Sequence, residues 1–177
     1  DQMRDIALPS DSSTSRALLQ WVLRRNNLDP KFHETGPDLV AMLEKSDGAL
    51  LIGDRALIAA KENPELVKLD LGAEWTQITG FPMVFGVFAA RKDSNLSKLN
   101  RARNDMVNQY NQFLHDESWR DEVISRTSSK LGFSISRISE YFLVEVQNKL
   151  DEESKEGLEY FLKEVCGMNK EIEWLSS

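Results

Sequence analysis

Hydroxyl-bearing side chains gather in one short segment near the beginning of the sequence. Residues 10–15 read Ser-Asp-Ser-Ser-Thr-Ser and directly precede a leucine-rich segment with helical spacing. The amino end of a helix carries free N–H groups and about half a positive charge, so it can bind a carboxylate or a phosphate, and adjacent hydroxyls add donors. The hydroxyl-bearing residues of this cluster, 10–15, are therefore candidate anion-binding residues. The competing interpretation is a plain helix cap, which is the commonest role of hydroxyl residues at this position.

Two further turns carry groups that could contact a ligand. Gly53 and Asp54 close a short apolar run, where a carboxylate can orient a ligand hydroxyl or take part in a proton transfer. The alternative is that Asp54 only caps the helix that follows. At the second turn, Gly80 would let a ligand approach the backbone and Thr79 would supply a hydroxyl. The alternative there is an ordinary turn between a helix and a strand.

Apolar runs predict the strands that position these turns. Ala49–Ile52 and Met83–Ala90 are short, non-alternating and bounded by Gly or Pro, which is typical of strands buried on both faces. Ile6–Leu8 is a third candidate strand. In open α/β sheets, ligands bind outside the carboxyl ends of the strands. The Gly53-Asp54 turn closes the run Ala49–Ile52, and the Thr79-Gly80 turn opens the run Met83–Ala90. We therefore expect both turns to face one cleft.

The remaining apolar residues follow a helical period. Leu18, Leu19, Val22 and Leu23 fall on one face of a helix, and the polar stretch 26–36 is predicted to be a connection. Shorter helical segments are expected over 39–43, 55–61 and 73–78. From residue 96 onwards the period continues to about residue 165, with helices starting near Asn95, Ser118, Ser134 and Asp151. The sequence therefore predicts a mixed α/β front half and a helical back half.

Composition narrows the classes of partner and chemistry. The 177 residues carry a formal net charge of −7 with a pI of about 5.0, which argues against nucleic acid as a main partner. No apolar run reaches the ~18 residues of a membrane span. The single Cys166 allows no internal disulfide, so nothing requires an oxidising compartment and we expect a cytoplasmic location. His33, His115 and Cys166 lack the spacing of a metal site or a Cys/His pair, and the sequence contains no Gly-x-Gly-x-x-Gly motif or P-loop, so no metal or organic cofactor is expected.

Several segments form a recognisable series along the chain: Ser13-Thr14-Ser15, Asp47–Leu57, Asp70–Trp75, Thr79–Phe85, Tyr141-Phe142, Leu150–Glu153 and Gly157–Phe161. In this order and at this spacing they resemble the chorismate dehydratases of the futalosine route to menaquinone. Each segment alone is a weak signal, whereas together they cover most of the chain. The resemblance implies a two-lobed fold like the type II periplasmic solute-binding proteins, with the ligand between the lobes.

The resemblance also implies a function. The family eliminates water from chorismate, a small anionic substrate, to give 3-[(1-carboxyvinyl)oxy]benzoate. Ser13, Thr14 and Ser15 would hold a carboxylate, and the turns at Gly53-Asp54 and Thr79-Gly80 would contact the ring or its hydroxyl. A fold of this kind also serves proteins that bind a small carboxylate and do no chemistry, so a non-catalytic solute-binding module is the alternative.

One departure from the family concerns the beginning of the chain. Family members start with a strand and an asparagine-containing loop that have no counterpart here, so we expect the chain to lack the opening half of the first lobe. Residues 6–69 would form the second lobe, and 70–177 the returning strand and closing helices of the first. We therefore assign no catalytic residue. Apolar surface meant for the absent part would favour pairing with another copy of the chain.

Overall fold

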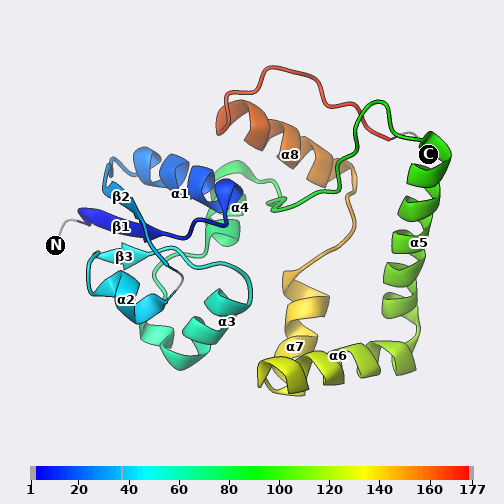
Figure 1. Cartoon of the computed structure of the whole chain (residues 1–177), viewed down its shortest axis with the longest axis horizontal. Coiled ribbons are helices and arrows are strands. Elements are labelled where there is room, and N and C mark those ends of the chain that lie inside the picture. Colours follow the sequence, from blue (N-terminus) through cyan, green and yellow to red (C-terminus); the bar gives the residue numbers. More distant parts are fainter. Residues whose placement is uncertain (1–2, 37, 176–177) are drawn as a thin grey trace. The chain divides into compact units, whose positions relative to one another are not determined.

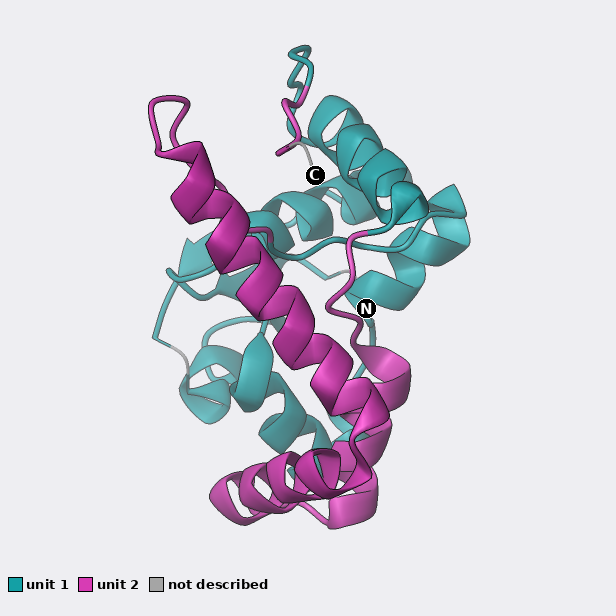
Figure 2. Ribbon diagram, turned by 90° about the vertical axis from the view of Figure 1, so that its right-hand side faces the viewer, with its two compact units in different colours: residues 1–86, 151–171 teal, residues 87–150, 172–177 magenta. Residues whose placement is uncertain are grey.

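The computed structural model describes residues 3–36 and 38–175, and it divides the chain into two compact units. Unit 1 comprises Asp1–Gly86 and Asp151–Glu171, and unit 2 comprises Val87–Leu150 and Ile172–Ser177 (Figure 2). Unit 1 holds every described strand and all the predicted site residues. The lobe boundary predicted at residues 69 and 70 concerns the complete fold of the family and stays a prediction.

A small parallel sheet forms the centre of unit 1. Its strands are β1 (Asp5–Leu8), β2 (Lys31–Glu34) and β3 (Gly48–Ala49), in the order β2-β1-β3 (Figure 1). Both neighbours run parallel to β1, and Ile6 lies opposite Phe32 on one side and Gly48 on the other. The predicted strand at Ile6–Leu8 is confirmed, and the mixed α/β class with it.

Two strand predictions need correction in this sheet. The stretch 26–36 is not only a connection, because Lys31–Glu34 pairs along the edge of the sheet as β2. Three of its four side chains are polar and exposed, and only Phe32 packs against the core, so the continuous apolar run of a buried strand is absent. The predicted strand Ala49–Ile52 pairs with β1 only at its start, since β3 ends at Ala49 and the chain then turns toward the next helix.

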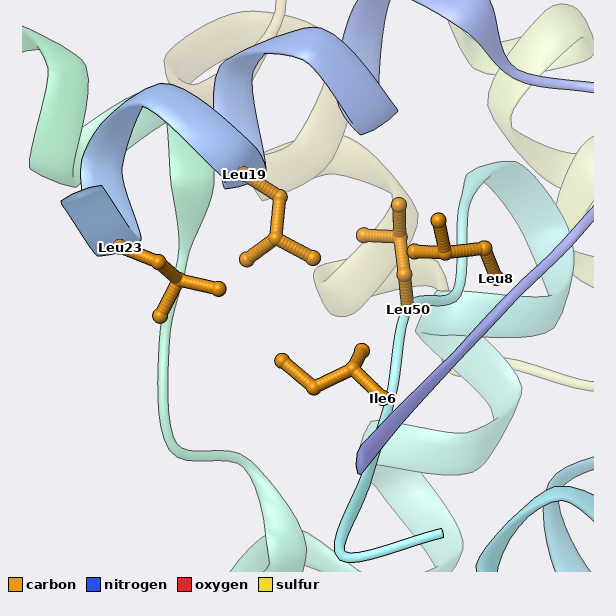
Figure 3. Packing of buried hydrophobic residues seen from close by; sticks show 5 residues of the cluster. All are labelled: Ile6, Leu8, Leu19, Leu23 and Leu50. Carbon is orange, nitrogen blue, oxygen red and sulfur yellow. The ribbon is translucent and has the colours of Figure 1, made fainter. Parts of the chain in front are cut away.

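Helix α1 (Ser13–Arg25) packs on one face of the sheet. Side chains of alternate residues in a strand point to opposite faces, so Ile6 and Leu8 share the face that meets the helix. In Figure 3, Leu19 and Leu23 of α1 point toward these residues. Leu50, just after β3, completes the buried cluster.

A second cluster lies on the neighbouring stripe of α1. Leu18 and Val22 pack against Trp75 of α4 (Leu71–Thr79) and Phe161 of α8 (Glu152–Glu164). Trp75 is fully buried, with its ring centroid 5.6 Å from that of Phe161. Helix α1 therefore contributes residues to both of these buried clusters, and its predicted apolar face is confirmed.

The remaining helices lie where their periodicity and caps place them, with small shifts. Unit 1 also contains α2 (Leu39–Leu43), α3 (Gly53–Glu62) and a 3-10 turn (Pro64–Leu66). Unit 2 contains α5 (Leu96–His115), α6 (Glu117–Leu131), α7 (Ile135–Glu140) and a π-helical turn (Tyr141–Glu145). The cap of α6 is Asp116 rather than the predicted Ser118, because the Asp116 carboxylate accepts from the N–H of Trp119 at 3.0 Å.

In the described ranges, no helix combines the length and apolarity that crossing a membrane requires.

The apolar run Met83–Ala90 is not a strand in this structure. A strand needs a hydrogen-bonding neighbour, and among the described residues the only ladders join β1 to β2 and β3. The segment is irregular and leaves Phe85, Val87 and Phe88 exposed, the last at 89%. The local sequence favours a strand, since these residues have high strand propensity, but no described segment pairs with this run.

We expect this exposed run to drive association of the 177-residue chain. Large apolar side chains at an unpaired segment favour contact with a second copy. Replacing Phe88 with Glu should shift the chain toward the monomer in sedimentation velocity, whereas Val40→Glu on α2, also at an exposed apolar position, should not. A wild-type chain that sediments as a single monomer at all concentrations would contradict the prediction.

A carboxylate ties the beginnings of two strands together. Asp47, just before β3, accepts hydrogen bonds from the backbone N–H groups of Arg4 at 2.7 Å and Asp5 at 3.1 Å. These two bonds hold the pKa of Asp47 below its ordinary value. The charged carboxylate thus stabilises the pairing of β1 with β3.

Replacing Asp47 with Asn should lower stability in a pH-dependent way. The folded pKa lies below the unfolded one, so the contribution of Asp47 is present above the ordinary value of 3.8 and is lost as the pH falls through the folded pKa. In urea unfolding, the wild type should exceed Asp47→Asn at pH 7, and the difference should shrink below pH 3.8. Asp29→Asn, at an exposed acidic residue, is the control. A difference that is the same at both pH values would contradict this role.

Candidate functional site

The sheet brings two of the three predicted site segments to the same edge. Because β1 and β3 run parallel and are neighbours, the loops after them leave the sheet at its carboxyl edge. The first loop leads into Ser13 at the start of α1, and the second leads into Gly53 at the start of α3. An ion pair joins the two directly, between the Arg55 guanidinium of α3 and the Asp11 carboxylate before α1.

The start of α1 offers backbone donors beside hydroxyl groups. Ser12 is the N-cap, and its hydroxyl accepts from the N–H of Ser15 at 3.3 Å. Helix geometry gives the N–H groups of Ser13 and Thr14 no partner inside the helix. Ser13 is exposed and Thr14 half-buried, whereas Ser15 is only 6% exposed. The capping role considered for this segment belongs to Ser12, and the binding role of the three following residues stays a prediction.

Two arginines near this helix start are paired with carboxylates. Arg16 in the first turn of α1 donates to the Glu34 carboxylate at the end of β2, with 3.1 Å between nitrogen and oxygen. Arg55 neutralises Asp11, the acidic residue nearest the cap. The first turn of α1 contains no acidic residue. An anion at Ser13 and Thr14 would therefore meet donors and compensated charge rather than an unpaired carboxylate in that turn.

Gly53 and Asp54 form the first turn of α3. Gly53 has a φ of +59°, a conformation that glycine adopts without the steric cost of a side chain. The N-cap position belongs to Ile52, so Asp54 lies inside the first turn and does not act as the capping residue. Its exposed carboxylate is stabilised by the positive end of the helix and is accessible to a ligand.

Thr79 and Gly80 end helix α4. The Thr79 hydroxyl donates to the carbonyl oxygen of Trp75 at 2.8 Å and accepts from the N–H of Phe81 at 3.2 Å. Gly80 terminates the helix with a φ of +79°. The contacts described for Thr79 are local, so the structure does not join this pair to the edge formed by α1 and α3. A hydroxyl has one donor and two acceptor sites, so Thr79 can accept one further hydrogen bond.

The histidine, cysteine and acidic side chains that the structure describes are the other candidates for metal ligands or nucleophiles. Within residues 3–36 and 38–175, no three His, Cys, Asp or Glu side chains are grouped as metal ligands. Partial desolvation raises the pKa of the Cys166 thiol although the residue is exposed, which leaves less of the nucleophilic thiolate at neutral pH. The ring of His33 lies 2.8 Å from the Asp5 carboxylate, where it links β2 to β1.

Sequence comparison places the chain in a family and beside a curated relative. Residues 1–165 match the sequence model of a family described as menaquinone biosynthesis. The chain belongs to this family, as its motifs predicted. It is also 35% identical over 104 residues to the chorismate dehydratase of Thermus thermophilus. That alignment covers 50% of this chain and 38% of the relative, so the chain spans less than half the length of the curated relative it matches.

Proposed function

We propose that the full-length protein is a chorismate dehydratase, which removes one water from chorismate to give 3-[(1-carboxyvinyl)oxy]benzoate. The observation that carries the proposal is the similarity to a curated chorismate dehydratase, within a family of menaquinone biosynthesis. The paired loops at the carboxyl edge of the sheet support it, because they place backbone donors and hydroxyls where ligands bind in α/β folds.

In this proposal the start of α1 binds a carboxylate of the substrate. The N–H groups of Ser13 and Thr14, together with their hydroxyls, supply donors, and Ser15 completes the segment from its buried position. The positive end of the helix adds favourable charge. The Arg55–Asp11 pair holds the loop in place and reduces the repulsion that the Asp11 carboxylate would otherwise exert on an anion.

The remaining site residues would contact the ring and its hydroxyl. Thr79 can take part only as an acceptor, because its own proton is directed to Trp75. It therefore suits the hydroxyl of chorismate and not a carboxylate. Asp54 would contact the ring or the same hydroxyl from the α3 side, and Gly53 and Gly80 would allow close approach to the backbone.

The chemistry asks the protein mainly to bind and to orient. Loss of water makes the ring aromatic, which supplies driving force, so no metal or organic cofactor forms part of the proposal. None of the residues above is assigned the proton transfer. We further propose that the complete protein has a two-lobed fold like the type II solute-binding proteins, with residues 6–69 in one lobe, and that it works in the cytoplasm.

Turnover of chorismate by the full-length protein tests the proposal. Incubation with chorismate should yield a product lighter by one water, detected by mass spectrometry, with the ultraviolet absorbance of an aromatic ring. Circular dichroism would verify that the protein is folded. A folded protein that binds chorismate in calorimetry but releases no product would instead support a solute-binding module, and one that does neither would contradict both functions.

A substitution at Thr14 should separate ligand binding from helix capping. Thr14→Val keeps the shape of the side chain and removes the hydroxyl, so it should weaken chorismate binding by about fivefold, equivalent to one hydrogen bond of ~1 kcal/mol. Ser12→Ala is the matched control, since it removes the cap and should cost ~1 kcal/mol of stability. Calorimetric titration and urea unfolding of both variants measure the two effects. Unchanged affinity in Thr14→Val would remove Thr14 from the site.

A further inference from the structure

A glycine in α8 lies unusually close to the turn that follows α4. Gly157 is buried, and a Cβ atom at this position would lie 2.7 Å from the carbonyl oxygen of Pro82 and 3.1 Å from the Cβ of Phe81. The nearer of these atoms belongs to the backbone, so a side chain could be accommodated only by moving the turn or the helix. Glycine is less favourable than alanine inside a helix, so helix propensity does not explain its presence here.

The same face of α8 continues this contact. Residues three and four positions after Gly157 lie on one side of a helix with it. There the ring of Tyr160 packs against that of Phe81, with 5.7 Å between centroids, and Phe161 packs edge-on against Trp75 at 5.6 Å. Tyr160 also contacts Trp75 at 5.8 Å. Helix α8 therefore packs both against α4 and against the turn that follows α4.

The turn at Phe81-Pro82 is hydrogen-bonded to the hydroxyl of Thr79. The N–H of Phe81 donates to the Thr79 hydroxyl oxygen, which in turn donates to Trp75. Any movement of Phe81 and Pro82 changes the first of these bonds and hence the direction of the remaining acceptor site. The absence of a side chain at Gly157 allows α8 to lie close to Phe81 and Pro82. The position of α8 therefore affects the Thr79 hydroxyl, a candidate ligand-binding group, through these two residues.

We infer that Gly157 is a positioning residue, which fixes the turn at Phe81-Pro82 and through it the acceptor direction of Thr79. The link from Gly157 to the turn stands on the contacts alone. The link to substrate rests on the proposed function, in which Thr79 accepts from the hydroxyl of chorismate. Gly157 touches no substrate in this account and acts only through the turn.

The test compares Gly157→Ala with Gly86→Ala in the full-length protein. The Cβ added at Gly86 meets no atom within 4 Å, so this control makes the same chemical change in open space. Amide hydrogen exchange, measured by NMR, should be faster at Phe81 in Gly157→Ala, relative to the amide of Leu50, which bonds to Ala7 in the sheet core. The KM for chorismate should rise by roughly tenfold with a smaller change in kcat, because a displaced binding group weakens ground-state and transition-state binding alike.

A second variant covers the case in which Gly157→Ala does not fold. Tyr160→Leu removes the ring that packs on Phe81 without introducing a clash, and it should produce the same two changes to a smaller extent. Exchange at Phe81 and a KM both equal to those of Gly86→Ala would overturn the inference, even if the melting temperature fell. Faster exchange with an unchanged KM would overturn the link to substrate.

Failure of the proposed function gives a different result. If the folded wild type does not convert chorismate, the link from Gly157 to substrate fails together with the proposed function. The exchange rate at Phe81 then still decides whether Gly157 fixes the turn, because that measurement needs no substrate.

Discussion

The packing of α1 on two sides is the constraint on which unit 1 depends. Leu19 and Leu23 are buried against the sheet, while Leu18 and Val22 are buried against Trp75 and its neighbours. Full burial of an apolar side chain of this size contributes about 1.5–3 kcal/mol, so the four together hold the helix far more firmly than any cap could. The start of α1 is consequently fixed with respect to the sheet edge, and its free N–H groups occupy a defined position without needing a ligand.

The polar groups at this edge orient the loops more than they stabilise the fold. The arginine side chains of the Arg55–Asp11 and Arg16–Glu34 pairs are each more than a third exposed, and ion pairs of this kind contribute about 0–1 kcal/mol. Neither pair could be predicted from the sequence, because the partners are 44 and 18 residues apart and meet only through strand pairing. The sequence did indicate turns followed by helices near Ser13 and Gly53, since the ends of apolar runs are visible locally, and the binding role of these segments stays a prediction.

The accuracy of the fold prediction follows the range of the interactions involved. Helices depend on spacing and caps within a few residues, so α1 and the long helices of unit 2 could be predicted, with errors such as the cap of α6. Strands depend on partners elsewhere in the chain. The segment Lys31–Glu34 therefore pairs with β1 although Phe32 is its only apolar residue. The apolar segment Met83–Ala90 stays irregular although its residues have high strand propensity.

Whether a candidate binding group donates or accepts hydrogen bonds restricts the class of ligand that it can bind. The start of α1 offers donors from Ser13 and Thr14, which favour an anion. Thr79 offers only an acceptor, because its proton and one lone pair are already used within its own turn. An anion that carries only acceptor atoms, such as sulfate, would satisfy the first group and not the second. Chorismate, the substrate in the proposed function, carries carboxylates together with a free hydroxyl, so it would offer the partner that each of these two separate groups requires.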